Sequence, residues 1–197
     1  GIFRNPIFPN FSKLFFRTAM RNVEIKASVE NWDELIRRAK DASGTDGTLI
    51  EQVDVFFHSQ NGRLKMRSLK TDGKESHELI WYSRNDQEGP KLSTYDKIEM
   101  DQKRCDEMTL LLRHSNGVRG EVRKARLLFL VGQTRVHCDQ VEGLGQFAEL
   151  EVVLNDDEPI ERGEEIANEL MKTLGIKDLI TCAYIDLLQK KAAAGEA

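Results

Sequence analysis

Apolar and polar residues alternate along many stretches of this chain, as they do in a β-strand that buries one face. Residues 21–29 show the alternation first, and residues 48–58 are rich in β-branched and aromatic side chains. Asn61-Gly62 then marks a hairpin turn. The pattern predicts eight strands, over about 21–29, 48–58, 63–70, 76–84, 92–100, 119–130, 133–140 and 146–154.

Helical spacing of apolar residues appears between some of these strands and after the last one. Asn31 is placed to cap a helix, because its side chain can accept a hydrogen bond from the backbone of the first turn. Gly175 separates two helices near the end of the chain. The predicted helices cover about 32–42, 101–113, 161–174 and 177–189.

Charged residues occupy every second position of several predicted strands, so they share one face of the sheet. The clearest cases are 22–26, 63–67, 124–126, 135–139 and 149–151. An ordinary sandwich buries apolar inner faces, whereas a closed sheet gives the charged faces a common polar lumen. We therefore predict an α+β fold, an eight-stranded antiparallel β-barrel with helices packed outside. The apolar face of the last helix is expected to cover this barrel.

The composition fits a single globular domain. The chain has 197 residues, of which 40% are hydrophobic and 31% are charged. The net charge of -4 gives no general attraction to nucleic acid, so an anion site must be a local concentration of lysine and arginine. No apolar run is long enough to span a bilayer. The oligomeric state stays open between a monomer and a homodimer.

The cysteines and the termini bear on the compartment. Three cysteines without a Cys-x-x-Cys pair predict reduced thiols in an intracellular compartment, in the first place the cytoplasm. Residues 1–19 contain basic and aromatic residues but no acidic one, which fits either an N-terminal arm or a mitochondrial targeting segment. The predicted domains are this arm over 1–19, a barrel domain over 20–189 and a flexible tail over 190–197.

Three glutamates are the acidic candidates. Glu149 and Glu151 lie two residues apart near the end of one predicted strand, and Glu24 lies in the first strand. Carboxylates without a cysteine or histidine pattern suit a hard cation such as Mg²⁺ or Mn²⁺. The plainer alternative is that a Glu-x-Glu pair is the solvated face of an amphipathic strand.

Basic residues lie at alternate positions of the other strands, and a closed sheet would direct them into the same lumen. Arginine can bind phosphate oxygens through two parallel hydrogen bonds, and lysine acts as a point charge. A ring of such residues suits a linear polyanion, although each base alone is more often a surface charge. The candidate phosphate-binding residues are Lys26, Lys65, Arg67, Arg84, Lys124, Arg126 and Arg135.

These motifs resemble the CYTH superfamily, also called triphosphate tunnel metalloenzymes, and within it the CyaB-like branch. Residues 22–26, Asn-Val-Glu-Ile-Lys, resemble the Glu-x-Glu-x-Lys signature of that superfamily. The order and spacing of the motifs carry the resemblance, which spans about 20–188. The other matching segments are 52–57, 62–67, 78–84, 122–126 and 135–151.

This resemblance implies an eight-stranded tunnel that holds a divalent metal and a triphosphate-bearing substrate. By motif, Glu24, Glu149 and Glu151 would hold the metal, and with Lys26 they form the expected catalytic group. The basic residues above would bind the phosphates. The residues expected to complete the lumen or to orient a neighbouring base are Asn22, Tyr82, His137 and Asp139.

Position 22 departs from the signature, because asparagine stands where the first glutamate is expected. Asparagine offers a neutral oxygen to a metal or a hydrogen bond to a phosphate, but no negative charge. If a two-metal arrangement applies, the second metal would bind more weakly at this end. Activity would then be reduced, altered or lost.

Three functions are consistent with these residues. The first is metal-dependent hydrolysis of an inorganic or organic triphosphate. The second is cyclisation of ATP to cyclic AMP with release of pyrophosphate, in which the ribose 3′-hydroxyl replaces water as the nucleophile. The third is a non-catalytic module that binds polyphosphate or nucleotide. The expected partner is a small molecule such as inorganic triphosphate, thiamine triphosphate or ATP.

Overall fold

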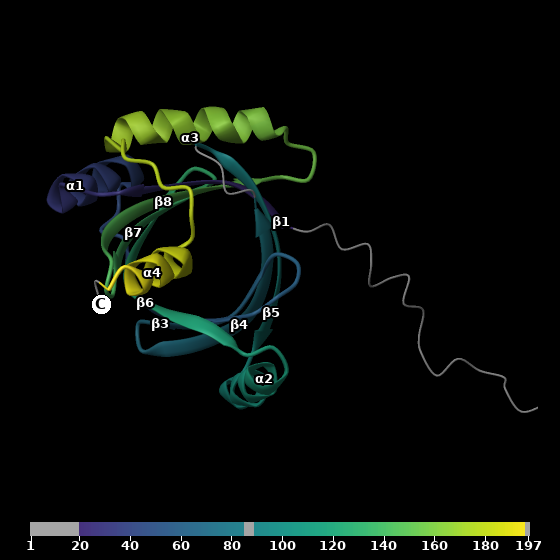
Figure 1. The fold of residues 1–197 in the computed structure, drawn as a ribbon. Helices are drawn as coiled ribbons and strands as arrows, with labels where there is room; N and C mark the ends of the chain where they lie inside the picture. The colour runs from purple at the N-terminus through teal and green to yellow at the C-terminus, as the bar shows by residue number, and fades with distance from the viewer. Residues whose placement is uncertain (1–19, 85–88, 196–197) are drawn as a thin grey trace, which may run out of the picture.

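The structure, a computed structural model, describes residues 20–84 and 89–195, apart from the side chain of Arg84. Eight strands close into an antiparallel barrel in the order β1-β5-β4-β3-β2-β6-β7-β8 (Figure 1), which confirms the predicted fold. The strands are β1 Met20–Ser28, β2 Thr48–Phe57, β3 Arg63–Thr71, β4 Lys74–Arg84, β5 Lys91–Met100, β6 Val118–Val131, β7 Thr134–Val141 and β8 Gly145–Leu154.

Helices cover the outside of the barrel, as expected. α1 and α3 pack together over β1, β6, β7 and β8, whereas α2 lies against β4 on the opposite side (Figure 1). α4 lies at one opening of the barrel. The helices are α1 Trp32–Ser43, α2 Gln102–Ser115, α3 Ile160–Leu174 and α4 Tyr184–Ala193.

The main apolar core lies between the barrel wall and its helices, not inside the barrel. Along β1, Val23 and Ile25 point outward into this core, while Asn22, Glu24 and Lys26 point into the lumen. Burial of the outward side chains beneath α1 and α3 provides the hydrophobic stabilisation of the fold. The period-2 alternation therefore separates a packed outer face from a charged inner face.

The last predicted helix, over 177–189, is wrong at both ends, because α4 covers Tyr184–Ala193. Before α4, Leu179 forms an isolated β-bridge to β1, and Ile180 N–H donates to Lys26 O at 2.8 Å. These bonds to the sheet replace helical hydrogen bonds, since tertiary pairing overrides a weak local propensity. The predicted apolar face nevertheless covers the barrel.

The structure describes the two predicted terminal segments to different extents. The predicted arm over 1–19 lies outside the described residues. The predicted tail begins within α4, where the Lys191 ammonium donates to Gly143 O at 2.9 Å. Within the described part of the chain, none of the helices has the length and apolar character needed to cross a membrane.

Candidate active site

The barrel encloses a cavity of about 420 Å³, and side chains from all eight strands line it. Asp139 is fully buried and does not line the cavity, and the side chain of Arg84 lies outside the described part of the chain. The predicted site residues that line this lumen are Asn22, Glu24, Lys26, Lys65, Arg67, Tyr82, Lys124, Arg126, Arg135, His137, Glu149 and Glu151.

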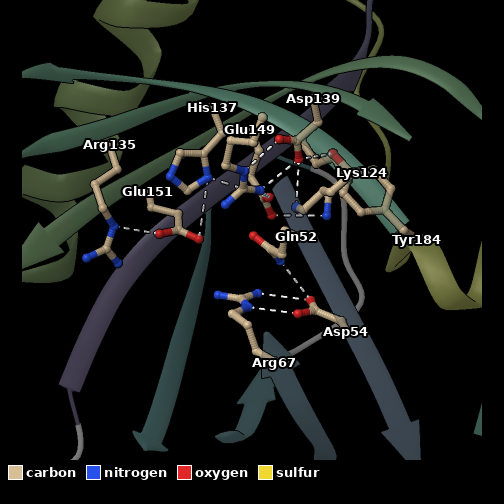
Figure 2. A network of polar contacts seen from close by, with 12 residues as sticks. Gln52, Asp54, Arg67, Lys124, Arg135, His137, Asp139, Glu149, Glu151 and Tyr184 are labelled. Atoms are coloured by element: carbon tan, nitrogen blue, oxygen red, sulfur yellow. Dashed lines mark hydrogen bonds and ion pairs between the residues drawn. The ribbon is translucent and has the colours of Figure 1, made fainter. Parts of the chain in front are cut away.

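The lumen has two different ends. At the end where α4 packs, the ammonium groups of Lys26 and Lys124 lie over the ring of Tyr184. At the opposite end, which we call the mouth, β1 and β2 begin and contribute Met20 and Ile50 to the lining. The arginines and glutamates of the site lie between these two ends (Figure 2).

Three potential metal ligands converge on the β7–β8 side of the lumen. The register pairs His137 with Glu149, and Glu24 of β1 with Glu151 of β8. Among the described residues, ligand atoms of His137, Glu149 and Glu151 lie within 4.8 Å of one another. Glu24 lines the same lumen but is not part of this compact group. The structure thus brings two of the three predicted glutamates together and adds a histidine.

The geometry of this group fits a shared cation. His137 Nδ1 lies 3.8 Å from a Glu149 oxygen and 3.9 Å from a Glu151 oxygen. These separations exceed a hydrogen bond, and His137 Nδ1 has no hydrogen-bond partner among the described residues. Asn22 Oδ1, also facing the lumen, is likewise buried without such a partner there. Carboxylates dominate the donor set, which favours a hard divalent ion.

The carboxylates of this group are ionised at neutral pH. Burial alone would raise the pKa of Glu149, but Lys26 at 3.0 Å and its other cationic neighbours hold the pKa well below its usual range. Burial is likewise outweighed at Glu151, where His137, which is protonated at the acidic pH at which this carboxyl titrates, and Arg135 lower the pKa to about 2. Burial and Arg126 lower the pKa of His137, so its ring is neutral and offers a lone pair.

Asp139 organises the bases on β6. Its carboxylate accepts hydrogen bonds from Lys124 at 2.8 Å, from Arg126 at 2.6 and 2.7 Å, and from the Tyr184 hydroxyl at 3.0 Å (Figure 2). Arg126 also donates to Glu149 at 2.9 Å. One buried anion thus fixes the direction of two cations, which is the geometry that the predicted orienting role of Asp139 requires.

A second buried carboxylate, Asp54, was missed in the sequence. It sits opposite Arg67 in the β2–β3 register and accepts two hydrogen bonds from that guanidinium, at 2.8 and 3.0 Å. Lys65 and Gln52 also donate to it, at 2.9 and 3.0 Å. Although burial opposes ionisation, Arg67 and Lys65 hold the pKa of Asp54 below its usual range. Asp54 therefore supports the β3 bases as Asp139 supports those of β6.

The alternation on β2 could have predicted that Gln52 and Asp54 face the lumen, because both occupy the alternate polar positions of that strand. Tyr184 is different. It lies forty-five positions from Asp139 in the chain, its bonding partner, and no local pattern links the two residues. Only the tertiary position of α4 brings this tyrosine into the site.

Comparison with known proteins agrees with the fold. A family model described as the CYTH domain matches residues 20–182. The chain belongs to the CYTH family. Proteins with this domain are typically metal-dependent enzymes that act on triphosphates. Among curated proteins, none matches this chain in sequence.

Solved structures show the same CYTH barrel at low sequence identity. The PH1819 protein from Pyrococcus horikoshii OT3 is 22% identical, with a TM-score of 0.71 over 86% of this chain and 99% of its own. A Vibrio parahaemolyticus protein described as "a putative adenylate cyclase" is 17% identical, with a TM-score of 0.68 over 88% and 99%. A Bacillus halodurans protein described in the same words is 17% identical, with a TM-score of 0.54 over 84% and 95%. At these identities the likeness shows the fold alone.

Proposed function

We propose that this CYTH protein is a metal-dependent triphosphatase that hydrolyses a triphosphate-bearing small molecule inside the barrel. One observation carries the proposal: the lumen gathers lysine and arginine from several strands around a compact carboxylate group. Phosphoryl transfer needs mainly positioning and neutralisation of charge, and this arrangement supplies both.

The chain's own residues would bind and orient the phosphates. Arg67 and Arg126 are each held by a buried carboxylate, so their remaining N–H groups keep a fixed direction toward the lumen. Lys26 and Lys124 add point charges at the α4 end. Arg135, paired with Glu151 at 2.8 Å, is nearer the mouth. A phosphate chain would thus meet cations along its length.

The metal would be held by Glu24, Glu149 and Glu151, with His137 beside them. We infer Mg²⁺ or Mn²⁺ from the carboxylate-rich donor set. When bound, such an ion supplies Lewis-acid neutralisation of phosphate charge. The lowered pKa of Glu151 keeps its carboxylate anionic, which suits it to hold a cation and makes it a poor proton acceptor.

The mouth favours an organic triphosphate over inorganic triphosphate. Leu69 of β3, Ile50 of β2 and Leu128 of β6 line it on one side, and these three strands are adjacent. Met20 and Tyr95 are register partners on the other side. Apolar side chains at the entrance gain nothing from phosphate, but they can cover the organic group of a substrate whose phosphates point inward.

Cyclisation of ATP is the second candidate, because the similar Vibrio parahaemolyticus protein is described as a putative adenylate cyclase. The phosphate-binding bases would serve both reactions. The distinction lies at the mouth, where a cyclase would hold the ribose so that its 3′-hydroxyl attacks the α-phosphate, the one next to the ribose, and pyrophosphate leaves.

Product analysis decides between these reactions. Purified protein with Mg²⁺ or Mn²⁺ is incubated separately with inorganic triphosphate, thiamine triphosphate and ATP. The Glu149→Gln variant, treated in the same way, is the inactive control. We expect orthophosphate from at least one organic triphosphate. Cyclic AMP with pyrophosphate would establish the cyclase instead, and binding without any product would leave a non-catalytic module.

We predict that kcat/KM for triphosphate falls above about pH 8. Burial and repulsion by Arg67 and Lys124 lower the pKa of Lys65 to about 8. The attraction of Asp54 opposes this shift but does not cancel it. Deprotonation above this pH removes positive charge from the lumen, so kcat/KM should drop by about tenfold between about pH 7 and pH 9. A pH profile of Lys65→Arg is the check, because arginine stays charged. The limb should become shallower but not flat, since burial and Arg126 also lower the pKa of Lys124 to about 8; an equally steep limb in the variant would contradict the assignment of Lys65.

We predict that Asn22→Glu strengthens metal binding. Asn22 is 2% exposed, lies two residues from Glu24, and its Oδ1 has no hydrogen-bond partner within the described residues. A glutamate there would add a second carboxylate to the β1 face. Calorimetry should show Mn²⁺ binding tighter by about tenfold, and thermal stability should fall in EDTA because the buried carboxylates repel one another. Asn22→Gln is the neutral control of equal size; the same metal affinity in both variants would show that position 22 is not the cause.

A further inference from the structure

The segment after the family match reaches into the lumen. The CYTH match ends at residue 182, and α4 begins with Tyr184. Tyr184 is 6% exposed and lines the cavity together with Ala183. An aromatic side chain from outside the matched region therefore forms part of the site wall.

Residues 181–186, at the end of the match and just beyond it, are held across one end of the barrel. Lys91 of β5 donates to Thr181 O at 2.8 Å. Arg63 of β3 and Arg119 of β6 both pair with Asp186 in the first turn of α4. Because β5, β3 and β6 lie at separate positions around the barrel, these contacts hold α4 over the opening (Figure 1).

An apolar cluster completes the closure at this end. Its buried members come from α4 and from the strands that meet it. A phosphate chain cannot pass through such a cluster, because its charges would lose their solvation without gaining partners. The cluster consists of Phe56, Val122, Val141, Phe147, Ala183, Tyr184 and Ile185.

Tyr184 is the member of this cluster that meets the charged lumen. Its ring centroid lies 3.9 Å from Lys26 Nζ and 5.0 Å from Lys124 Nζ, within the range of cation–π attraction. Its hydroxyl donates to Asp139 at 3.0 Å. Figure 2 shows Tyr184 beside Lys124 and Asp139, at the opposite end of the site from Arg135.

We propose that Tyr184 is the floor of the lumen and determines how many phosphates the site accepts. The inference rests on the proposed triphosphate-binding function. A chain that enters at the mouth must stop at the ring, where Lys26 and Lys124 hold its last phosphate. Tyr184 is thus a specificity-determining residue, and shortening its side chain should make room for one further phosphate beside the same two lysines.

Equilibrium binding of inorganic triphosphate and inorganic tetraphosphate tests whether Tyr184 limits the number of bound phosphates. Calorimetric titrations of the full chain are run in EDTA, where no turnover is expected, and repeated with Mg²⁺. In Tyr184→Ala, the affinity ratio of tetraphosphate to triphosphate should rise by about tenfold, equivalent to about 1.4 kcal/mol. Tyr184→Phe keeps the ring and should keep the wild-type ratio, although it loses the hydrogen bond to Asp139.

A cavity left by Tyr184→Ala could unfold the α4 end, so circular dichroism and a second variant accompany the test. Tyr184→Leu keeps apolar volume but is shorter, and it should shift the ratio in the same direction. An unchanged affinity ratio in whichever of these variants is folded would overturn the proposed role of Tyr184 while leaving the proposed function intact. If the wild type binds triphosphate neither in EDTA nor with Mg²⁺, the proposed function is overturned, and the proposed role of Tyr184 fails with it.

Discussion

Glu149→Gln should lower kcat for the preferred triphosphate by about 10²–10³-fold, the loss typical of one preorganised electrostatic group. The amide keeps the size of the side chain but removes a charge that lies 3.0 Å from Lys26 and 2.9 Å from Arg126. It also removes one of the three predicted carboxylate ligands of the metal. The loss should therefore appear in kcat and in Mn²⁺ affinity.

The affinity for triphosphate, by contrast, should not fall in Glu149→Gln. Lys26 and Arg126 would no longer be neutralised by Glu149, so phosphate should bind as tightly as in the wild type or more tightly. Steady-state kinetics and calorimetry separate the two effects. Glu121→Gln is the matched control, because Glu121 is exposed on the outer face of β6, away from the lumen. A reduced triphosphate affinity with unchanged kcat would contradict the assigned role of Glu149.

Asp139→Asn should reduce the free energy of unfolding by about 3–5 kcal/mol, the cost of removing one partner from a buried ion pair. Asp139 has no solvent exposure and holds Lys124 and Arg126. Although burial opposes its ionisation, these cations keep the pKa of Asp139 below its usual range. Without the carboxylate, two buried cations lose their closest anion. For a domain of this size the change corresponds to a fall in Tm of about 10 °C.

Chemical denaturation with matched variants measures this effect. Asp41→Asn removes a carboxylate that pairs with Arg37 at 2.8 Å, but this pair is exposed on α1, so water screens it and its loss should change the stability little. Added triphosphate should restore part of the stability lost in Asp139→Asn, because phosphate can replace the missing anion beside Lys124 and Arg126. Equal stabilities of the two variants would show that Asp139 does not hold these bases.

The charge pairing of the lumen depends on register, which no local pattern specifies. Arg67 faces Asp54 across β2–β3, and Arg126 faces Asp139 across β6–β7. Each partner lies on a neighbouring strand, so a register shift of one residue would turn its side chain to the other face. The sequence predicted bases that point inward, but it did not show that most of those whose side chains the structure describes pair with a buried carboxylate.

The sequence by itself determined the eight strands and the inward direction of residues such as Glu24, Lys65 and Glu149, because a strand's period of two is a local property and the apolar positions must face a core. Only the tertiary structure decided that His137 joins the carboxylates and that Tyr184 closes the lumen. Both depend on segments far apart in the chain, whose proximity arises from strand pairing and helix docking. Backbone hydrogen bonds to β1 also keep the residues before position 184 out of the last helix, which therefore begins at Tyr184. Local helix propensity could not predict this boundary.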